Sequence, residues 1–290
     1  MIYLFSTILA GILWGTISLF LKPLSGMGYS SLQIMLFRAL FSALFVFLFL
    51  LIKDRKLLKI ELKDLWMFVG TGVISLTFFS ICYFKTILEV GTSVAVILLY
   101  TSPIFILLFS RVLFKEKITL VKIIALVLTF AGCILVSGVL GGGSKISLKG
   151  FLIGVCAGLG YGLYSIFSRY ALRKYNSLTV TFYTFIFSGL SILPFSHPAT
   201  MAGSFTGKIW LLFVGISFLC TFLPYLFYTF GLSGLETGTA AIVVTVEPLV
   251  GTLIGFLIWH ESVSIPKILG IIMIFVAIIL CGLPSKKEEK

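Results

Sequence analysis

The chain is divided into ten long apolar stretches, and this pattern limits its possible folds more than any other feature. The hydrocarbon core of a bilayer is about 30 Å thick, and a helix needs about 20 apolar residues to cross it. Strands of a membrane β-barrel would be about half that length and would alternate polar with apolar residues, an alternation that these stretches lack. We therefore predict an all-α integral membrane protein with ten transmembrane helices. The expected spans cover residues 2–21, 31–52, 65–88, 92–114, 119–139, 148–170, 178–196, 209–233, 238–259 and 265–283.

The composition agrees with this prediction. The chain is 59% hydrophobic and 11% charged, whereas soluble globular proteins are about 45–50% apolar and about 25% charged. These values argue against a soluble enzyme, a nucleic-acid-binding protein and a disordered chain. The five cysteines all fall inside apolar stretches, at no metal-ligand spacing. We therefore expect no disulfide, no metal site and no cofactor.

The distribution of Lys and Arg between the loops indicates the orientation. The net charge is +12, and with the N-terminus in the cytoplasm the inner segments hold 15 basic residues and the outer segments hold 6. Cytoplasmic loops of membrane proteins carry an excess of Lys and Arg. We therefore predict a multi-pass protein of the plasma membrane with both termini in the cytoplasm.

The chain also repeats itself. Each half holds five spans, and because five is odd, the two copies are expected to cross the membrane in opposite directions. Such inverted repeats are typical of transporters, with the substrate near the midplane where the repeats meet. The predicted units are a first repeat at 1–140, a Gly/Ser-rich extracellular linker at 141–147, a second, inverted repeat at 148–284 and a charged cytoplasmic tail at 285–290. The matched residues are Tyr83, Pro103, Glu116 and Lys122 with Tyr228, Pro248, Glu261 and Lys267 at an offset of 145, and Gly11, Trp14, Gly15, Ser18 and Lys22 with Gly158, Tyr161, Gly162, Ser165 and Arg169 at an offset of 147.

The order and spacing of these residues resemble the EamA family of the drug/metabolite transporter superfamily, over nearly the whole chain (about 2 to 284). That resemblance implies a ten-helix inverted-repeat fold. It also implies secondary transport of small metabolites, often outward, with amino acids a frequent substrate class. The residues that carry it are Trp14-Gly15, Arg38, the series Tyr83, Pro103, Glu116 and the series Tyr228, Glu247-Pro248, Glu261.

Two charged residues, Glu247 and Arg38, lie deep inside predicted spans. Glu247 is about 13 Å into the ninth span, where an unpaired carboxylate costs several kcal/mol. It either titrates and couples transport to protons, or binds a cationic group, or caps backbone groups freed by Pro248. Arg38 is about 10 Å below the outer end of the second span. Its planar guanidinium either binds a substrate carboxylate or is structural, pairing with Glu247 or with carbonyl groups.

Prolines and aromatic residues complete the predicted site. Pro103, Pro224 and Pro248 interrupt spans, and broken helices often mark transporter sites, although a simple kink satisfied by neighbouring helices is the alternative. Aromatic side chains beside these glycines and prolines are expected to line the cavity, or else to pack the core or anchor the interface. The aromatic candidates are Trp14, Tyr83, Tyr100, Tyr161, Tyr225 and Tyr228. Glu116 and Glu261 are expected at opposite membrane surfaces, as caps or in salt bridges.

Three classes of membrane protein were weighed. A channel would carry a repeated filter motif, and a membrane enzyme would carry a cluster of His, Asp or Glu at one membrane face; neither pattern is present. A secondary transporter that moves a small metabolite, an amino acid or related compound, by alternating access therefore fits best, with export favoured and import or exchange as the alternative. Its cavity is expected between spans 1, 3, 4, 6, 8 and 9. We expect no enzymatic activity, protons as the coupling ion, and a monomer sufficient for transport, with a dimer also compatible.

Overall fold

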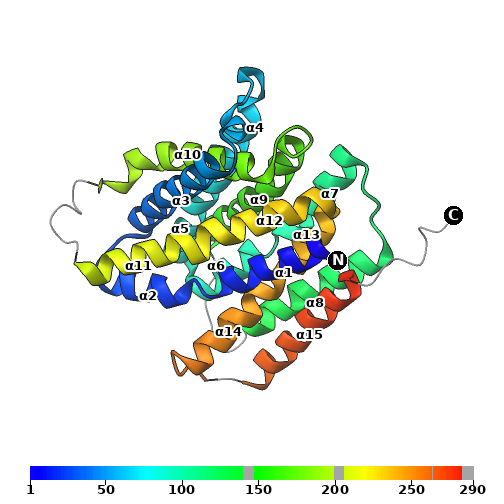
Figure 1. Cartoon of the computed structure of the whole chain (residues 1–290). Coiled ribbons are helices and arrows are strands. Elements are labelled where there is room, and N and C mark those ends of the chain that lie inside the picture. Colours follow the sequence, from blue (N-terminus) through cyan, green and yellow to red (C-terminus); the bar gives the residue numbers. More distant parts are fainter. Residues whose placement is uncertain (140–146, 199–205, 263, 283–290) are drawn as a thin grey trace.

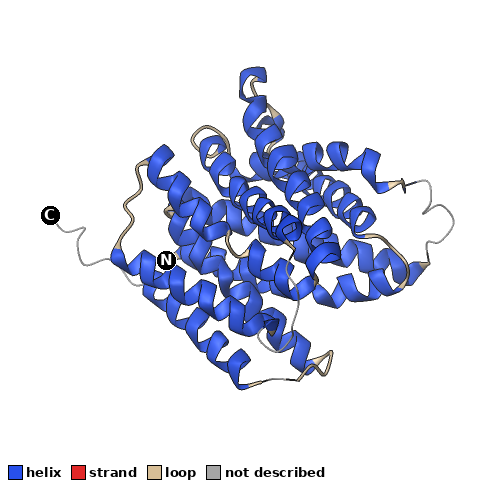
Figure 2. Cartoon of the chain, turned by 180° about the vertical axis from the view of Figure 1, so that it is seen from behind, coloured by secondary structure: helices blue, strands red, loops and turns tan. Residues whose placement is uncertain are grey.

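The computed structural model describes residues 1–139, 147–198, 206–262 and 264–282, and every regular element in these ranges is helical (Figures 1 and 2). Ten helical segments are long and apolar enough to cross a membrane, as the sequence predicts. Most of the predicted linker and all of the predicted tail lie outside the described residues. The spans are Ile2–Gly26, Ser31–Lys53, Leu62–Val90, Thr92–Phe114, Leu120–Ser137, Leu148–Ala171, Ser177–Ser196, Gly207–Gly234, Thr237–Leu257 and Ile265–Gly282.

Five of the ten spans are single helices and the other five are interrupted. The single helices are α3 (Ser31–Lys53), α8 (Leu120–Ser137), α9 (Leu148–Ala171), α10 (Ser177–Ser196) and α15 (Ile265–Gly282). Span 1 is divided into α1 (Ile2–Gly15) and α2 (Ser18–Gly26), span 4 into α6 (Thr92–Leu99) and α7 (Ser102–Phe114), and span 9 into α13 (Thr237–Val243) and α14 (Glu247–Leu257). Spans 3 and 8 contain π-helical turns, at Gly70–Thr77 between α4 (Leu65–Val69) and α5 (Phe78–Val90), and at Phe218–Phe222 between α11 (Gly207–Ser217) and α12 (Leu223–Gly234).

The three predicted hinge prolines all lie in the first turn of a helix that follows such an interruption. Pro103 is in the first turn of α7, Pro224 in that of α12 and Pro248 in that of α14. Proline is tolerated there because the N–H that it lacks has no partner inside the helix. The prolines therefore lie where a new helical segment begins.

The bundle is held together by helix pairs that combine the two halves of the chain. The most extensive contacts join α1 to α12, α5 to α9, α3 to α10 and α8 to α15. Small residues allow the close approaches. At the α8–α15 contact, a Cβ atom added to Gly132 would lie 2.8 Å from the carbonyl oxygen of Gly270, and one added to Gly270 would lie 2.6 Å from that of Gly132.

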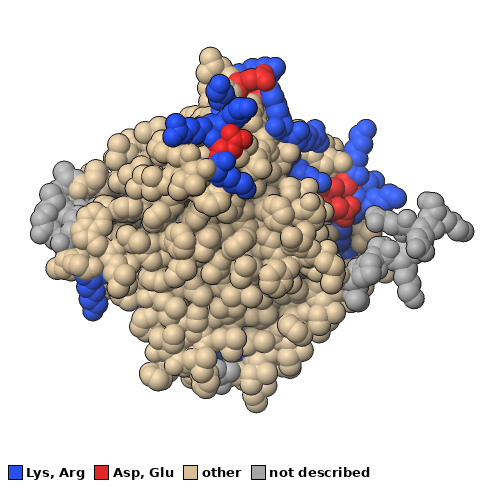
Figure 3. Space-filling view, in the orientation of Figure 1, with Lys and Arg blue, Asp and Glu red and all other residues tan. Residues whose placement is uncertain are grey.

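The bundle has two ends that differ in charge. The start of α1 and the end of α15 lie side by side (Figure 1), with a Cβ atom on Gly282 falling 3.3 Å from Leu4. We call this end the termini face; it also carries the loops at 54–61, 115–119, 172–176 and 235–236. The opposite end, the pocket face, carries the loops at 27–30 and 258–264 and the turn at Gly91. Figure 3 shows Lys and Arg gathered toward the termini face, above a band of uncharged residues.

Candidate functional site

A cavity with a volume of about 280 Å³ opens at the pocket face. Its rim carries residues at helix ends, among them Thr92 and Ser93, which are exposed, and Lys267, which is half-buried. Its floor reaches Trp14 and the start of α14. The lining residues are Trp14, Gly15, Ile17, Ser18, Thr92, Ser93, Val96, Tyr100, Val136, Ser137, Glu247, Pro248, Gly251, Thr252, Glu261 and Lys267.

Glu247 places a carboxylate in the wall of this pocket. The residue is the first of α14, directly after a 3-10 turn at Val244–Val246. No described residue donates a hydrogen bond to its side chain, and no Lys or Arg nitrogen of the described chain lies within ion-pair distance. A carboxylate in low-dielectric surroundings is stable only with a partner, with water or with a proton. Glu247 is therefore available to a group that enters the pocket.

Arg38 lies elsewhere and has partners of its own. From α3, its Nε donates to Thr221 Oγ1 at 2.8 Å and its Nη2 to the carbonyl oxygen of Cys220 at 3.4 Å. Both acceptors belong to the π-helical turn of span 8, where the i→i−4 ladder is interrupted. Arg38 does not line the pocket and interacts with Glu247 only through the longer-range electrostatic field. Of the roles expected for Arg38, the contact with a carbonyl group is the one present in this conformation.

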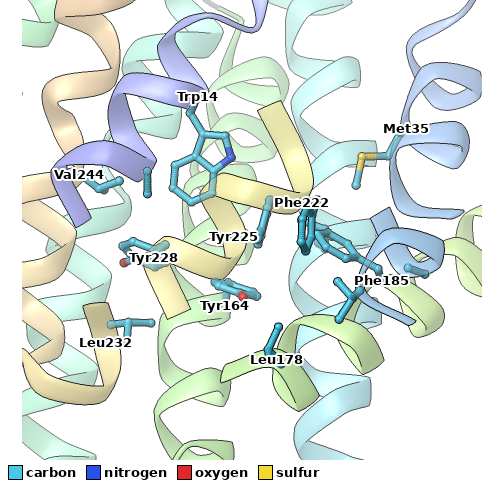
Figure 4. Packing of buried hydrophobic residues seen from close by; sticks show 14 of the residues in the cluster. Trp14, Met35, Tyr164, Leu178, Phe185, Phe222, Tyr225, Tyr228, Leu232 and Val244 are labelled. Atoms are coloured by element: carbon cyan, nitrogen blue, oxygen red, sulfur yellow. The ribbon is translucent and has the colours of Figure 1, made fainter. Parts of the chain in front are cut away.

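A cluster of aromatic side chains separates the pocket from the termini face. Trp14 packs edge-on against Tyr225, with ring centroids 5.0 Å apart, and Tyr225 packs edge-on against Tyr164 at the same separation (Figure 4). The Tyr164 hydroxyl lies 2.7 Å from Thr229 Oγ1 and the Tyr228 hydroxyl 2.8 Å from Ser165 Oγ. Only a small cavity of about 10 Å³ remains among these rings. The cluster thus closes the route from the pocket toward the termini face.

The sequence-predicted residues divide between these two regions. Trp14, Tyr100, Glu247 and Pro248 line the open pocket, and Trp14, Tyr161, Tyr225 and Tyr228 line the small cavity. Tyr83, Arg38, Pro103 and Pro224 line neither, and the Tyr83 ring packs against Phe79 with centroids 5.7 Å apart.

Several lining residues were missed from the sequence. Val136 and Ser137, at the end of α8, belong to span 5, which was not expected to contribute. No polar stripe on that span marks them. Tyr164 was also missed, although it follows the predicted Tyr161 by three residues on the same helix, a spacing that places both on one face.

Comparison with known proteins was made on the whole chain. A profile of the EamA-like transporter family matches residues 1–138 and again residues 148–283. An uncharacterized transporter of Archaeoglobus fulgidus is 25% identical over 94% of this chain and 93% of its own length. An uncharacterized inner membrane transporter of Salmonella typhimurium, YicL, is 21% identical over 98% of this chain and 96% of its own. A solved crystal structure superposes over 99% of both chains with a TM-score of 0.84 and 17% identity, which shows the shared fold alone.

Proposed function

The chain belongs to the EamA-like transporter family, and we propose that its open pocket carries a small metabolite across the plasma membrane by alternating access. The pocket volume of about 280 Å³ lies at the lower end of the range for small-molecule sites, about 300–1,000 Å³. The pocket reaches one face and ends at packed aromatic rings before the other. These features suit one state of a carrier, since a channel would need a continuous path.

The observation that carries the proposal is the Glu247 carboxylate. This carboxylate has no ion-pair partner in the described chain. The residues that surround it at the floor of the pocket are largely apolar or aromatic. Trp14 and Tyr100 add ring faces that attract cations. We infer that the substrate presents an ammonium group to Glu247, as an amino acid or a related amine does. When the pocket is empty, a proton or water takes that place, which gives a route for proton coupling.

The remaining parts of the proposal follow from sequence. The odd number of spans in each half supports repeats threaded in opposite directions. The bias of Lys and Arg supports a cytoplasmic termini face, so the pocket of this conformation would open outside the cell. We propose export because transport by members of this family is often outward. One chain holds all ten spans, so that a monomer is sufficient for transport.

The decisive experiment measures binding and transport with the same protein. A thermal-shift screen of amino acids and amines on detergent-solubilised protein identifies a ligand, because binding to the folded state raises the apparent stability. That ligand should then show saturable counterflow in proteoliposomes. Glu247→Gln should abolish the ligand-induced shift and lower counterflow at least tenfold. The matched control is Glu89→Gln, which breaks an exposed ion pair with Lys149 away from the pocket.

Three outcomes would contradict the proposal. Full counterflow by Glu247→Gln would remove the carboxylate from the site. Equal losses in both variants would mean that the effect is not specific to the pocket. Voltage-driven currents that do not saturate, in place of counterflow, would indicate a channel.

A further inference from the structure

Two matched turns, one at each end of the bundle, share several backbone features. Lys115, directly after α7, and His260, three residues after α14, have positive φ of 58° and 52°, and they match at the offset of 145. The next residue is a glutamate in both, and its N–H donates to the carbonyl oxygen six residues earlier, Glu116 to Ser110 and Glu261 to Gly255.

The lysines that follow are also matched. Lys122 Nζ donates to the carbonyl oxygen of Lys117 at 2.9 Å, and Lys267 Nζ donates to that of Ser262 at 3.0 Å. The two turns are therefore built alike from the matched residues of the two halves.

At the termini face, the Glu116 carboxylate caps the start of α13. Its Oε1 accepts from the backbone N–H of Thr237 and from Thr237 Oγ1, both at 2.8 Å, and its Oε2 accepts from the N–H of Gly238 at 3.2 Å. All of these groups are buried, with Thr237 fully inaccessible. Beside them, Lys122 forms an ion pair with Glu236. This face is closed by a carboxylate on a helix N-terminus.

At the pocket face, the Glu261 carboxylate has a different partner. It forms an ion pair with Lys22 at 2.8 Å, and both side chains are about half exposed, at 49% and 47%. The position that matches Thr237 is Thr92, the first residue of α6, and the N-cap residue of this helix, Gly91, has no side chain with which to cap it. Thr92 and Ser93 are exposed and line the same pocket as Glu261. Among the described residues, the contact that Glu116 makes at one face therefore has no counterpart at the other, although the matched residues line one pocket.

We propose that Glu261 closes the pocket by leaving Lys22 and capping α6 at Thr92 and Ser93. Glu116 then leaves the start of α13, so that the termini face opens as the pocket face closes. The cap is favourable because unsatisfied N–H groups and the helix dipole both attract a carboxylate. The half-exposed pair with Lys22 contributes little by comparison, so that little free energy holds Glu261 away from the start of α6. This inference rests on the alternating access proposed above and names the contact that would regulate it.

The test follows the width of the pocket mouth without any transported solute. Spin labels are attached at Leu88→Cys, near the end of α5, and at Ile265→Cys, the first residue of α15, where the native side chains are 86% and 75% exposed. The five native cysteines are replaced by alanine, and the distance distribution is measured in nanodiscs. Glu261→Gln should raise the ratio of long to short distances about fivefold to tenfold, because a neutral side chain caps weakly. Lys22→Gln should lower the same ratio, because it frees Glu261 to cap α6.

The control variant is Lys149→Gln, which breaks the ion pair with Glu89 at the same face and should leave the ratio unchanged. Opposite shifts from Glu261→Gln and Lys22→Gln support the proposal, since a merely structural role of the pair would move both variants in the same direction. Shifts of the same sign, no shift in either variant, or an equal shift from Lys149→Gln would overturn it. Loss of counterflow while the distances still switch would reject the proposed substrate transport and leave the gate intact.

Discussion

The two halves of the chain share a framework but contribute different charges to the membrane interior. The position in the first half that matches Glu247 is Ser102, at the same offset of 145, and Ser102 is a buried residue at the start of α7. Its side chain does not line the pocket. The second half thus places a carboxylate where the first half has a hydroxyl.

Arg38 shows the opposite asymmetry. Counted from the helix N-caps Ser30 and Asn176, the residue that matches Arg38 is Thr184. Thr184 donates to Thr71 Oγ1, and Thr71 lies in the π-helical turn of span 3, as the partners of Arg38 lie in that of span 8. Both residues therefore link a long helix to a π-helical turn, Arg38 through its guanidinium group and Thr184 through its hydroxyl group. The matched positions thus make similar contacts in the two halves, and one half supplies a charged side chain where the other supplies a hydroxyl.

The largest difference between the halves is expected where helices touch at matched glycines. A Cβ atom on Gly15 would lie 2.6 Å from Val250 Cβ and 2.7 Å from the carbonyl oxygen of Glu247, so that α1 and α14 would have to separate. On the matched Gly162, the nearest atoms would be Ile106 Cγ1 at 3.1 Å and the carbonyl oxygen of Ser102 at 3.2 Å, a milder crowding. Gly15→Ala should destabilise the protein by about 1–3 kcal/mol. Gly162→Ala should be nearly neutral, because its milder crowding is offset by the helix propensity of alanine, about 1 kcal/mol.

The apparent unfolding midpoint in detergent checks this pair. Ligand binding should also weaken in Gly15→Ala, because the crowded backbone belongs to Glu247 itself. Equal midpoints for the two variants would show that the matched contacts are equivalent in energy despite their different spacing.

The second comparison concerns the hydrogen bonds that Arg38 and Thr184 make to the two π-helical turns. Arg38→Lys removes the planar donor set that reaches Cys220 and Thr221, and should cost about 1–2 kcal/mol of stability. Thr184→Val removes one hydroxyl and should cost about 1 kcal/mol or less. In both variants the dissociation constant of the ligand found by the screen should change less than twofold, as neither residue lines the pocket. A tenfold weaker ligand affinity in Arg38→Lys with an unchanged midpoint would instead assign Arg38 to the substrate.

The sequence predicts the scaffold better than the site, and particular residues show why. The ten membrane spans follow from hydropathy, because an apolar stretch long enough to cross a bilayer can be recognised without knowing which helices pack against it. Glu247 is found because an intramembrane carboxylate is rare whatever surrounds it. The partners of Arg38 could not be found in this way, because the carbonyl of Cys220 becomes available only through a π-helical turn, which no residue pattern marks.

Long-range contacts escape sequence reasoning for the same reason. Glu116 is expected as a surface cap or ion pair, but its target, the start of α13, is set by how α7 and α13 pack. Likewise, Val136 and Ser137 reach the pocket because α8 ends beside α6, a contact that neither span signals in its own sequence.

The smallest expected effect concerns a tether at the termini face, between the loop after span 2 and the loop after span 6. Lys174 lies 2.5 Å from Glu61 Oε1 and 2.7 Å from Asp64 Oδ2. The hydrogen bond from Lys174 lowers the pKa of Glu61 below its ordinary value of 4.5, and the bonds to Asp64 and Glu61 raise the pKa of Lys174 above 10.5. The Glu61 contribution to stability is therefore full above about pH 5 and is lost as the pH falls through its lowered folded pKa. That of Lys174 is full below about pH 10 and is lost as the pH rises further.

Glu61→Gln should lower the apparent unfolding midpoint by about 1–2 °C at pH 7, because an exposed ion pair is largely screened by water and salt. The difference from the unsubstituted protein should stay constant between pH 5 and 8 and shrink as the pH falls through the lowered pKa of Glu61, where the carboxylate of the unsubstituted protein takes up a proton. Glu89→Gln, which breaks the ion pair with Lys149 at the pocket face, provides the matched comparison. A deficit in Glu61→Gln that does not shrink as the pH is lowered would mean that the side chain acts through packing and that its charge does not stabilise the tether.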